Sequence, residues 1–351
     1  MVINALLSGA AYAQTAPSAD PNKPTAQGLD VLGLSAETPA RAPTIDDLSE
    51  VIIEAPEPVY VAPTLRDRIG RIWAPVTING KGPFRLVLDT GASRSAVTPA
   101  VSERLGVEAT SPTALLVHGV TGSAVVPAVK VDKMEVGELL IEPSILPVVA
   151  DAFGGAEGVL GREGLSDKRI FADFLHDKLI ISRSHGERAK SGFTTVPLKL
   201  VKGGLLMADI SIGGVRTRAI IDTGGQQSVG NMALRNALMR HPPLDATQED
   251  IIGVTLEPQR GTTVRVAPIV LGTLKVHNAH VTFSDLFLFE HWNYRDEPTM
   301  LIGMDVLGLF DTLIIDYKLH ELQIRPRSDG GLQGLQMRLD PPMDQGPRSR
   351  F

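Results

Sequence analysis

Short apolar runs separated by glycine and asparagine turns dominate the sequence after residue 65. Residues 71–78 form one such run, which ends at Asn79-Gly80 and is followed by a second run at 84–88. Asn-Gly between two runs of this kind is a strong signal for a two-residue β-hairpin. The same pattern returns in the second half as residues 205–212, the pair Gly213-Gly214 and residues 218–221. We therefore predict a mostly β protein that contains a duplicated unit.

The duplication extends well beyond these hairpins. Each copy continues with a helix-like segment, a glycine-bearing hairpin and an apolar pair followed by glycine, at 99–105, 119–122 and 159–161 in the first copy and at 232–239, 253–261 and 301–303 in the second. Asp173 and Asp316 are expected to open matching final strands. They lie 143 residues apart, against 133 for the starts of the helix-like segments, and the ten additional residues fit the stretch Phe287–Pro298. We expect two lobes, at 66–188 and 193–326.

The segments outside the two lobes have a different composition. Residues 1–13 are mostly apolar and end in Ala-Tyr-Ala, which is typical of the start of an export signal, although a disordered start would have a similar composition. Residues 14–65 form a linker rich in proline, alanine and acids, and residues 327–351 form a polar tail. The apolar residues at 51–53 and 59–61 either belong to that linker or add an edge strand or lie over a cleft. We expect a periplasmic or secreted protein.

Composition narrows the classes of function. The chain has 351 residues, 43% of them hydrophobic, and its net charge of −6 comes from the acidic residues before position 66. No dense basic patch indicates nucleic acid, and no apolar run reaches the ~18–20 residues that a membrane span needs. The absence of cysteine excludes disulfides, thiolate zinc sites and cysteine nucleophiles. His277 and His280 have no third ligand nearby in the sequence, so we expect no metal and no cofactor.

The repeated element with the clearest chemical meaning is Asp-Thr-Gly. It occurs as Asp89-Thr90-Gly91 and as Asp222-Thr223-Gly224, each directly after an apolar run and at matching points of the two copies. Two carboxyl groups in contact cannot both ionise easily, so such a pair retains one proton over a range of pH. The ionised partner can then accept a proton from water while the protonated partner donates to a peptide carbonyl.

The residues beside these aspartates fit the same chemistry. Gly91 and Gly224 allow a tight turn and let backbone N–H groups approach the carboxylates. Thr90 and Thr223 can lock the two loops together through hydrogen bonds from hydroxyl to backbone. Such a lock would set the separation of the two acids, so we predict that the two aspartates form a catalytic dyad.

Together these features resemble the retropepsin-like aspartic proteases, in a single-chain form with both halves in tandem. The resemblance covers about residues 70–325 and includes Gly161-Arg162-Glu163 and Gly303-Met304-Asp305 after the apolar pairs. It implies an all-β fold with short helices and two pseudo-symmetric closed lobes. It also implies an endopeptidase that cleaves peptide or protein substrates by direct attack of water. Because both halves are present, we expect a monomer rather than an obligate dimer. The residues expected in flap hairpins over the substrate are His118, Gly119, Gly122 and Gly253.

Several positions leave alternatives open. Pepsin-like enzymes usually place serine or threonine after the glycine, whereas this chain has Ala92 and Gly225, so we predict a less acidic dyad and an optimum nearer neutral pH. The polar Gly-Gln-Gln sequence at 225–227 is also compatible with a peptide-binding module without activity, and swapped lobes could form a dimer. His118 either contacts substrate or sits in a solvated hairpin. Residues 291–294 either line the cleft or anchor the second lobe as a packed loop.

Overall fold

The computed structural model describes both predicted lobes and three short strands outside them. The described residues are 4–6, 53–54, 71–106, 114–136, 139–141, 144–151, 154–176, 178–239, 241, 243–327 and 338–339. Of the predicted signal segment, linker and tail, only β1 (Asn4–Leu6), β2 (Ile53–Glu54) and β26 (Arg338–Leu339) are among them. The apolar residues at 59–61 lie outside the described residues.

The first copy folds into short strands and one helix. Its elements are β3 (Trp73–Ile78), β4 (Lys81–Leu88), β5 (Ala96–Val97), α1 (Pro99–Leu105), β6 (Ala114–His118), β7 (Ser123–Val131), β8 (Met134–Val136), β9 (Leu139–Ile141), β10 (Ser144–Pro147), β11 (Gly158–Leu160), β12 (Lys168–Asp173) and β13 (Lys178–Arg183).

The second copy repeats this order with additional short helices. Its elements are β14 (Thr194–Leu200), the 3₁₀ turn η2 (Lys202–Gly204), β15 (Leu206–Ile212), β16 (Val215–Ile221), β17 (Val229–Gly230), α2 (Met232–Leu238), β18 (Thr247–Ile252), β19 (Pro258–Arg265), β20 (Ile269–Leu271), β21 (Leu274–Val276), β22 (His280–Phe283), α3 (Phe287–His291), β23 (Thr299–Ile302), α4 (Met304–Leu307), β24 (Thr312–Asp316) and β25 (Glu321–Arg325).

The predicted hairpins form where asparagine and glycine take left-handed turn conformations. Asn79 (φ 50°) and Gly80 (φ 74°) connect β3 to β4, and Gly213 (φ 55°) and Gly214 (φ 86°) connect β15 to β16. Both positions of such a turn need positive φ, which these residues tolerate. β4 begins directly after its turn, at Lys81, three residues before the apolar run. Alternate residues of β3 are buried, as expected for a strand with one face on the core.

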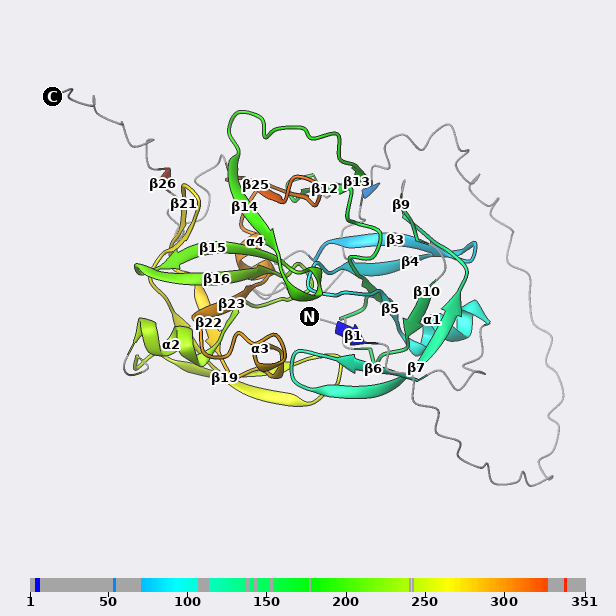
Figure 1. Cartoon of the computed structure of the whole chain (residues 1–351), viewed down its shortest axis with the longest axis horizontal. Helices are drawn as coiled ribbons and strands as arrows, with labels where there is room; N and C mark the ends of the chain where they lie inside the picture. The colour runs from blue at the N-terminus through cyan, green and yellow to red at the C-terminus, as the bar shows by residue number, and fades with distance from the viewer. Residues whose placement is uncertain are drawn as a thin grey trace, which may run out of the picture.

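Two sheets form most of the first lobe, and one long sheet runs through the second. The sheets of the first lobe have the strand orders β1-β6-β7-β10 and β5-β11-β4-β3-β8-β9. The long sheet has the order β18-β19-β22-β17-β23-β16-β15-β14-β25-β24-β12-β13-β2. Figure 1 shows the two lobes side by side, with β3 and β4 in one and β15 and β16 in the other. This is the all-β, bilobal architecture that the sequence predicts.

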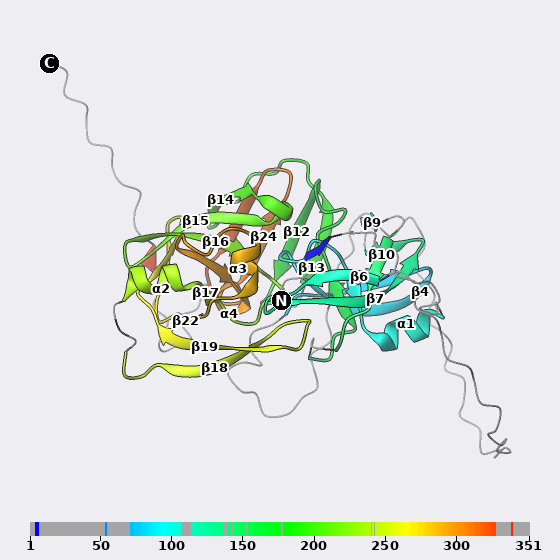
Figure 2. The same cartoon turned by 60° about the horizontal axis from the view of Figure 1, so that its bottom comes forward.

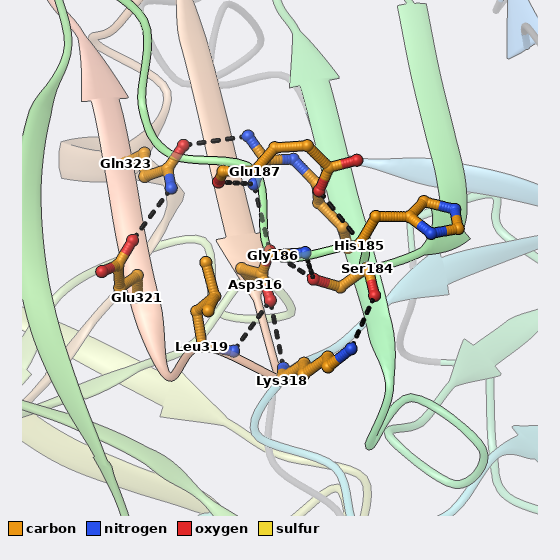
Figure 3. A network of polar contacts seen from close by, with 10 residues as sticks. Ser184, His185, Gly186, Glu187, Asp316, Lys318, Leu319, Glu321 and Gln323 are labelled. Carbon is orange, nitrogen blue, oxygen red and sulfur yellow. Dashed lines mark hydrogen bonds and ion pairs between the residues drawn. The ribbon is translucent and has the colours of Figure 1, made fainter.

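The two lobes are joined through one strand near the end of each copy. β12 of the first copy pairs antiparallel with β24 of the second, so both lobes share one sheet. Fully buried Asp316 accepts hydrogen bonds from Nη1 of Arg169 (3.0 Å) and Oγ of Ser184 (2.8 Å). Arg169 also donates from Nη2 to Oε1 of Gln323 (2.9 Å). Figure 3 shows this network, which ties β12, β24, β25 and the residue after β13 together beside the lobe junction.

The prediction that Asp173 and Asp316 open the final strands is wrong. Each aspartate ends a strand, β12 or β24, and the final strands β13 and β25 follow after a turn. Oδ1 of Asp173 accepts the backbone N–H groups of Leu175 (3.1 Å) and His176 (3.2 Å). Asp316 makes the equivalent bonds two and three residues on, at 3.1 and 2.9 Å. An aspartate that bonds to the backbone in this way forms a turn rather than beginning a strand.

Two short edge strands and the position of one glycine also bear on what the sequence predicted. β2 pairs with β13, with Ile53 opposite Leu179, which favours the edge-strand interpretation of residues 51–53. β1 pairs with β6, a contact that the sequence did not predict. Gly261 lies inside β19 opposite Glu249, so the second glycine-bearing turn is shorter than predicted. Among the described residues, no helix combines the length and apolar character that crossing a membrane requires.

Candidate active site

Two equivalent strand ends hold the two Asp-Thr-Gly loops. β4 pairs in parallel with β11, and the N–H of Asp89 continues this ladder by donating to the carbonyl of Leu160 (2.9 Å). β16 pairs in parallel with β23, and the N–H of Asp222 donates to the carbonyl of Ile302 (3.0 Å). The apolar pair that closes each copy therefore supports the aspartate of the same copy. Both aspartates are buried at the junction between the lobes.

The two threonines cross-link the loops through four hydrogen bonds. Oγ1 of Thr90 donates to the carbonyl of Ile221 (2.6 Å) and accepts from the N–H of Thr223 (3.2 Å). Oγ1 of Thr223 donates to the carbonyl of Leu88 (2.7 Å) and accepts from the N–H of Thr90 (3.1 Å). These are the cross-axis bonds that the sequence predicts. Each of these four bonds joins one lobe to the other, so the lock fixes the position of one aspartate relative to the other.

Gly224 shows how closely the two aspartates approach each other. A Cβ atom at this position would collide with the carboxyl group of Asp89. The glycine is therefore required by close packing between the loops rather than by its own turn conformation. The carboxyl of Asp222, on the same loop as Gly224, is near enough to act on the titration of Asp89.

The two carboxyl groups have unequal hydrogen-bond donors. Oδ1 of Asp222 accepts two backbone N–H bonds, from Gly224 (3.1 Å) and Gly225 (3.0 Å). Oδ1 of Asp89 accepts one, from Gly91 (2.8 Å), and no N–H or hydroxyl of the described residues donates to its Oδ2. Burial, together with the negative charge of Asp222, raises the pKa of Asp89 well above its usual range. The pair is therefore built to retain a proton.

A serine six residues after each aspartate anchors the aspartate loop through hydrogen bonds, a feature that sequence reasoning missed. Oγ of Ser95 accepts from the N–H of Gly161 (3.0 Å), and the N–H of Ser95 donates to Glu163 (2.5 Å). Ser228 repeats both contacts: its Oγ accepts from the N–H of Gly303 (3.1 Å), and its own N–H donates to Asp305 (2.9 Å). The matching distance from each Asp-Thr-Gly was the signal in the sequence that could have found them.

The acids below the loops are themselves buried. Burial raises the pKa of Glu163 above its usual range. Burial also raises the pKa of Asp305 to about 6, although its bonds to Ser228 act in the opposite direction. These residues follow the closing glycine of each copy, so the Gly-Arg-Glu and Gly-Met-Asp sequences hold the serine of the aspartate loop.

Two hairpins lie over the aspartates and contact each other at their tips. Figure 2 shows β6–β7 and β18–β19 pointing toward each other from opposite lobes. Oγ1 of Thr121 lies 3.1 Å from Oγ1 of Thr255, on the facing turn. Val120 packs into a buried cluster of the second lobe, and Val254 packs into one of the first. Each flap therefore closes by inserting a valine into the opposite lobe.

The predicted flap residues lie in these two turns. Gly119 and Gly122 bracket the first turn, where the N–H of Gly119 donates to the carbonyl of Gly122 (2.7 Å), and Gly253 opens the second. A Cβ at Gly119 would lie 2.8 Å from Cγ2 of Val254, so the crossing of the flaps requires this glycine. His118 ends β6 and stacks on rings of α3 rather than lining the cavity beside the aspartates.

A cavity of about 470 Å³ adjoins Asp222 under the second flap. Apolar side chains and residues of the second flap form most of its wall, and Arg71 and Gln226 also line it. With its amide oxygen facing the guanidinium, Gln226 accepts from Nη2 (2.5 Å) and Nε (3.2 Å) of Arg71. Burial lowers the pKa of Arg71, and nearby Asp89 acts in the opposite direction. Arg71 was not singled out from the sequence, where it reads as the first residue of an apolar strand.

The second copy has no arginine at the matching place. The position 133 residues after Arg71 is Gly204, and a Cβ there would collide with the guanidinium of Arg162. Arg71 and Arg162 therefore both come from the first lobe. Among the described residues, no three histidine, cysteine or acidic side chains cluster in a way that could hold a metal ion.

Comparison with known proteins was made against families, curated proteins and solved structures. A family model described as "Aspartyl protease" matches residues 74–163 and 208–306, one match in each lobe. The curated proteins give no match. A retropepsin-like aspartic protease from Rickettsia conorii is similar at 14% identity, covering 40% of this chain and 96% of its own, with a TM-score of 0.27. Basic 7S globulin from soybean is similar at 10% identity, covering 73% of this chain and 93% of its own, with a TM-score of 0.36.

Proposed function

Because the two family matches together span more than half of the chain, it belongs to the aspartyl protease family, and we propose that it is an active aspartic endopeptidase. In this proposal Asp89 and Asp222 are the catalytic residues, and the substrate is an extended peptide or protein segment under the two flaps. Thr90, Gly91, Thr223 and Gly224 support the loops that carry the acids.

The observation that carries the proposal is the pair of buried aspartates, one from each lobe, held together by the threonine lock. Burying two like charges destabilises a fold unless the pair retains a proton. A module that only binds peptides has no need of such a pair. The raised pKa of Asp89, caused first by burial and then by the charge of Asp222, is consistent with a shared proton.

The unequal donors support a division of roles between the two acids. Asp222, which accepts two backbone N–H bonds, would accept a proton from the attacking water. Asp89 would hold the proton that is donated to the substrate carbonyl oxygen as the water oxygen bonds to the carbonyl carbon. The resulting diol then collapses: the C–N bond breaks, the leaving nitrogen takes the proton from Asp222, and one diol hydroxyl returns its proton to Asp89. No acyl-enzyme forms on this route.

The test is cleavage of a peptide library between pH 3 and pH 8 by the wild type, Asp89→Asn and Asp222→Asn. We expect internal cleavage by the wild type, inhibition by a statine-type transition-state analogue, and loss of cleavage in both variants. Circular dichroism of each variant controls for folding. A wild type that cleaves nothing but still binds the inhibitor would support the peptide-binding alternative, and full activity in either variant would refute the assigned dyad.

Two further properties are proposed with the function. We propose a monomer, supported by the pairing of β12 with β24 within one chain, which brings both aspartates into a single site. Sedimentation would test this, and a swapped dimer would sediment at twice the mass. We also propose a periplasmic or secreted location, on the composition of residues 1–65, which cell fractionation would test.

A further inference from the structure

Three aromatic rings connect the first flap to a helix of the opposite lobe. His118 is the last residue of β6, directly before the flap turn. Its ring stacks on His291 of α3, with centroids 4.4 Å apart and planes at 27°, and on Phe287, with centroids 5.8 Å apart and planes at 22°. Phe287 and His291 also stack on each other at 5.7 Å. Each ring stacks on the other two, so the three form one compact cluster, which we call the ring latch.

The ring latch lies beside the place where the flap is inserted into the second lobe. Val120, two residues after His118, belongs to a buried cluster that also contains Leu288, Phe289 and Trp292 of the α3 region. The region from Phe287 corresponds to the ten additional residues of the second copy, so the first copy has no equivalent. The latch therefore acts on one flap only, and it acts through an element that the duplicated unit lacks.

His118 is held in a fixed orientation. Its side chain is buried, with 8% exposed, and Nδ1 lies 2.6 Å from Oγ of Ser123 on β7. A histidine that bonds across the base of the hairpin and stacks on the other lobe couples the hairpin to that lobe. The position of the flap then depends on whether the stack is intact.

We propose that His118, Phe287 and His291 form a pH-sensitive latch that holds the first flap closed over the two aspartates and releases it in acid. For its effect on turnover the proposal rests on the proposed peptidase function, whereas the flap movement itself does not. His118 and His291 are positioning residues in this proposal, because they act on substrate through the flap.

The chemistry of the stack gives the direction of the switch. Burial and the neighbouring His291 lower the pKa of His118, so the closed flap favours the neutral ring. When both rings become charged, their repulsion across the stack opposes closure. Among the other titratable groups on the packed elements, Glu290 lies 3.6 Å from Arg295, Asp285 lies 3.9 Å from Arg295, and Glu257 lies beside Gly122. The charge that acts on His118 is therefore that of His291.

The flap movement can be measured without any activity assay. The chain has no cysteine, so spin labels can be placed at Val125→Cys on β7 and Leu200→Cys on β14, two exposed positions on opposite lobes. Electron–electron distance measurements would be made at pH 7.5 and pH 5. A second pair, Leu200→Cys and Leu244→Cys, lies within the second lobe and reports any loss of folding.

We expect one narrow distance for the first pair at pH 7.5 and a second, longer population at pH 5. His291→Phe keeps an aromatic partner and removes one charge, so it should stay closed at both values, since a charged His118 is then attracted to the ring. His291→Ala should show the open population at both values. The exposed His185 provides the matched control, and His185→Phe should behave as the wild type. A wild-type distance that does not change with pH, or a closed His291→Ala, would overturn the proposal.

Turnover gives a second readout that distinguishes the two proposals. His291→Ala should raise KM about two- to tenfold, the loss expected for one aromatic pair, with a smaller change in kcat. His291→Phe should move the acid limb of kcat/KM to lower pH, because the repulsion that opens the flap is removed. If no variant cleaves peptides but the label distances follow this pattern, the peptidase function is wrong and the latch is right. If cleavage is normal and the acid limb is the same in all variants, the latch is wrong.

Discussion

Replacing Thr90 by valine would test whether the cross-axis lock holds the two lobes and the two acids together. Valine keeps the shape of threonine but can neither donate to the carbonyl of Ile221 nor accept from the N–H of Thr223. Both threonines are fully buried, so the two backbone groups lose their hydroxyl partner without gaining water. At about 1–3 kcal/mol for each buried group left unpaired, the free energy of unfolding should fall by about 2–6 kcal/mol.

The matched control is Thr90→Ser, which keeps the hydroxyl and loses one methyl group. It should cost about 1 kcal/mol, the value expected for that methyl group. Urea unfolding of the wild type and both variants gives the free energies, and peptide cleavage gives kcat for the fraction that remains folded. Thr90→Val should lose kcat as well as stability, because the separation of the acids is no longer fixed. Equal unfolding free energies for the valine and serine variants would refute the reasoning.

Other changes test the remaining parts of the site. Burial raises the pKa of Asp305 to about 6, so its protonated form favours folding: this stability is present below about pH 4 and is lost as pH rises through about 6. Asp305→Asn should therefore reduce the change in unfolding free energy between pH 4 and pH 7 by up to about 3 kcal/mol. An equal change in the variant and the wild type, measured by urea unfolding, would contradict this. Arg169→Met leaves the buried carboxylate of Asp316 without its cation and should lower the free energy of unfolding by about 3–5 kcal/mol, measured by thermal denaturation, whereas a loss below about 1 kcal/mol would show that the network is not needed. Gly224→Ala pushes a methyl group into the carboxyl of Asp89 and should lower kcat about a hundredfold while circular dichroism stays native; normal kcat would show that the loops can separate. The raised pKa of Asp89 predicts that cleavage continues toward neutral pH, and an optimum below about pH 3 would contradict it.

The hairpins and the aspartate loops could be predicted because their signals are local. Asn79-Gly80 requires two positive φ angles, and the structure has them. Asp-Thr-Gly places a hydroxyl and an N–H at fixed positions on each loop, so repeating it predicts the cross-axis bonds once two lobes are assumed. The helix at Pro99–Leu105 begins at a proline in its first turn and ends at Gly106 in the left-handed region, as local capping rules predict.

What the sequence did not reveal depends on contacts between the copies. Arg71 reads as part of an apolar strand, and its role appears only when the opposite lobe brings Gln226 to it. His118 was assigned to a flap, but its stacking partners lie 169 and 173 positions later in the sequence. Comparing the copies position by position would have exposed one such contact, because Gly204 stands where the repeat would place an arginine. At a position of this kind, a side chain of one copy occupies the space that the other copy leaves open.

The Gly-Gln-Gln sequence of the second copy was the reason for considering a binding module without activity, and its geometry points the other way. With Gly225 after Gly224, a second backbone N–H reaches Oδ1 of Asp222, where Asp89 receives only the N–H of Gly91. A dyad with equal donors would share its proton equally, whereas unequal donors direct the proton to one side. The additional N–H supplies in backbone form part of what a serine or threonine hydroxyl would supply at that position. The loop that departs from the pepsin-like pattern therefore adds a donor to Asp222, the carboxylate that we propose accepts the proton of the attacking water.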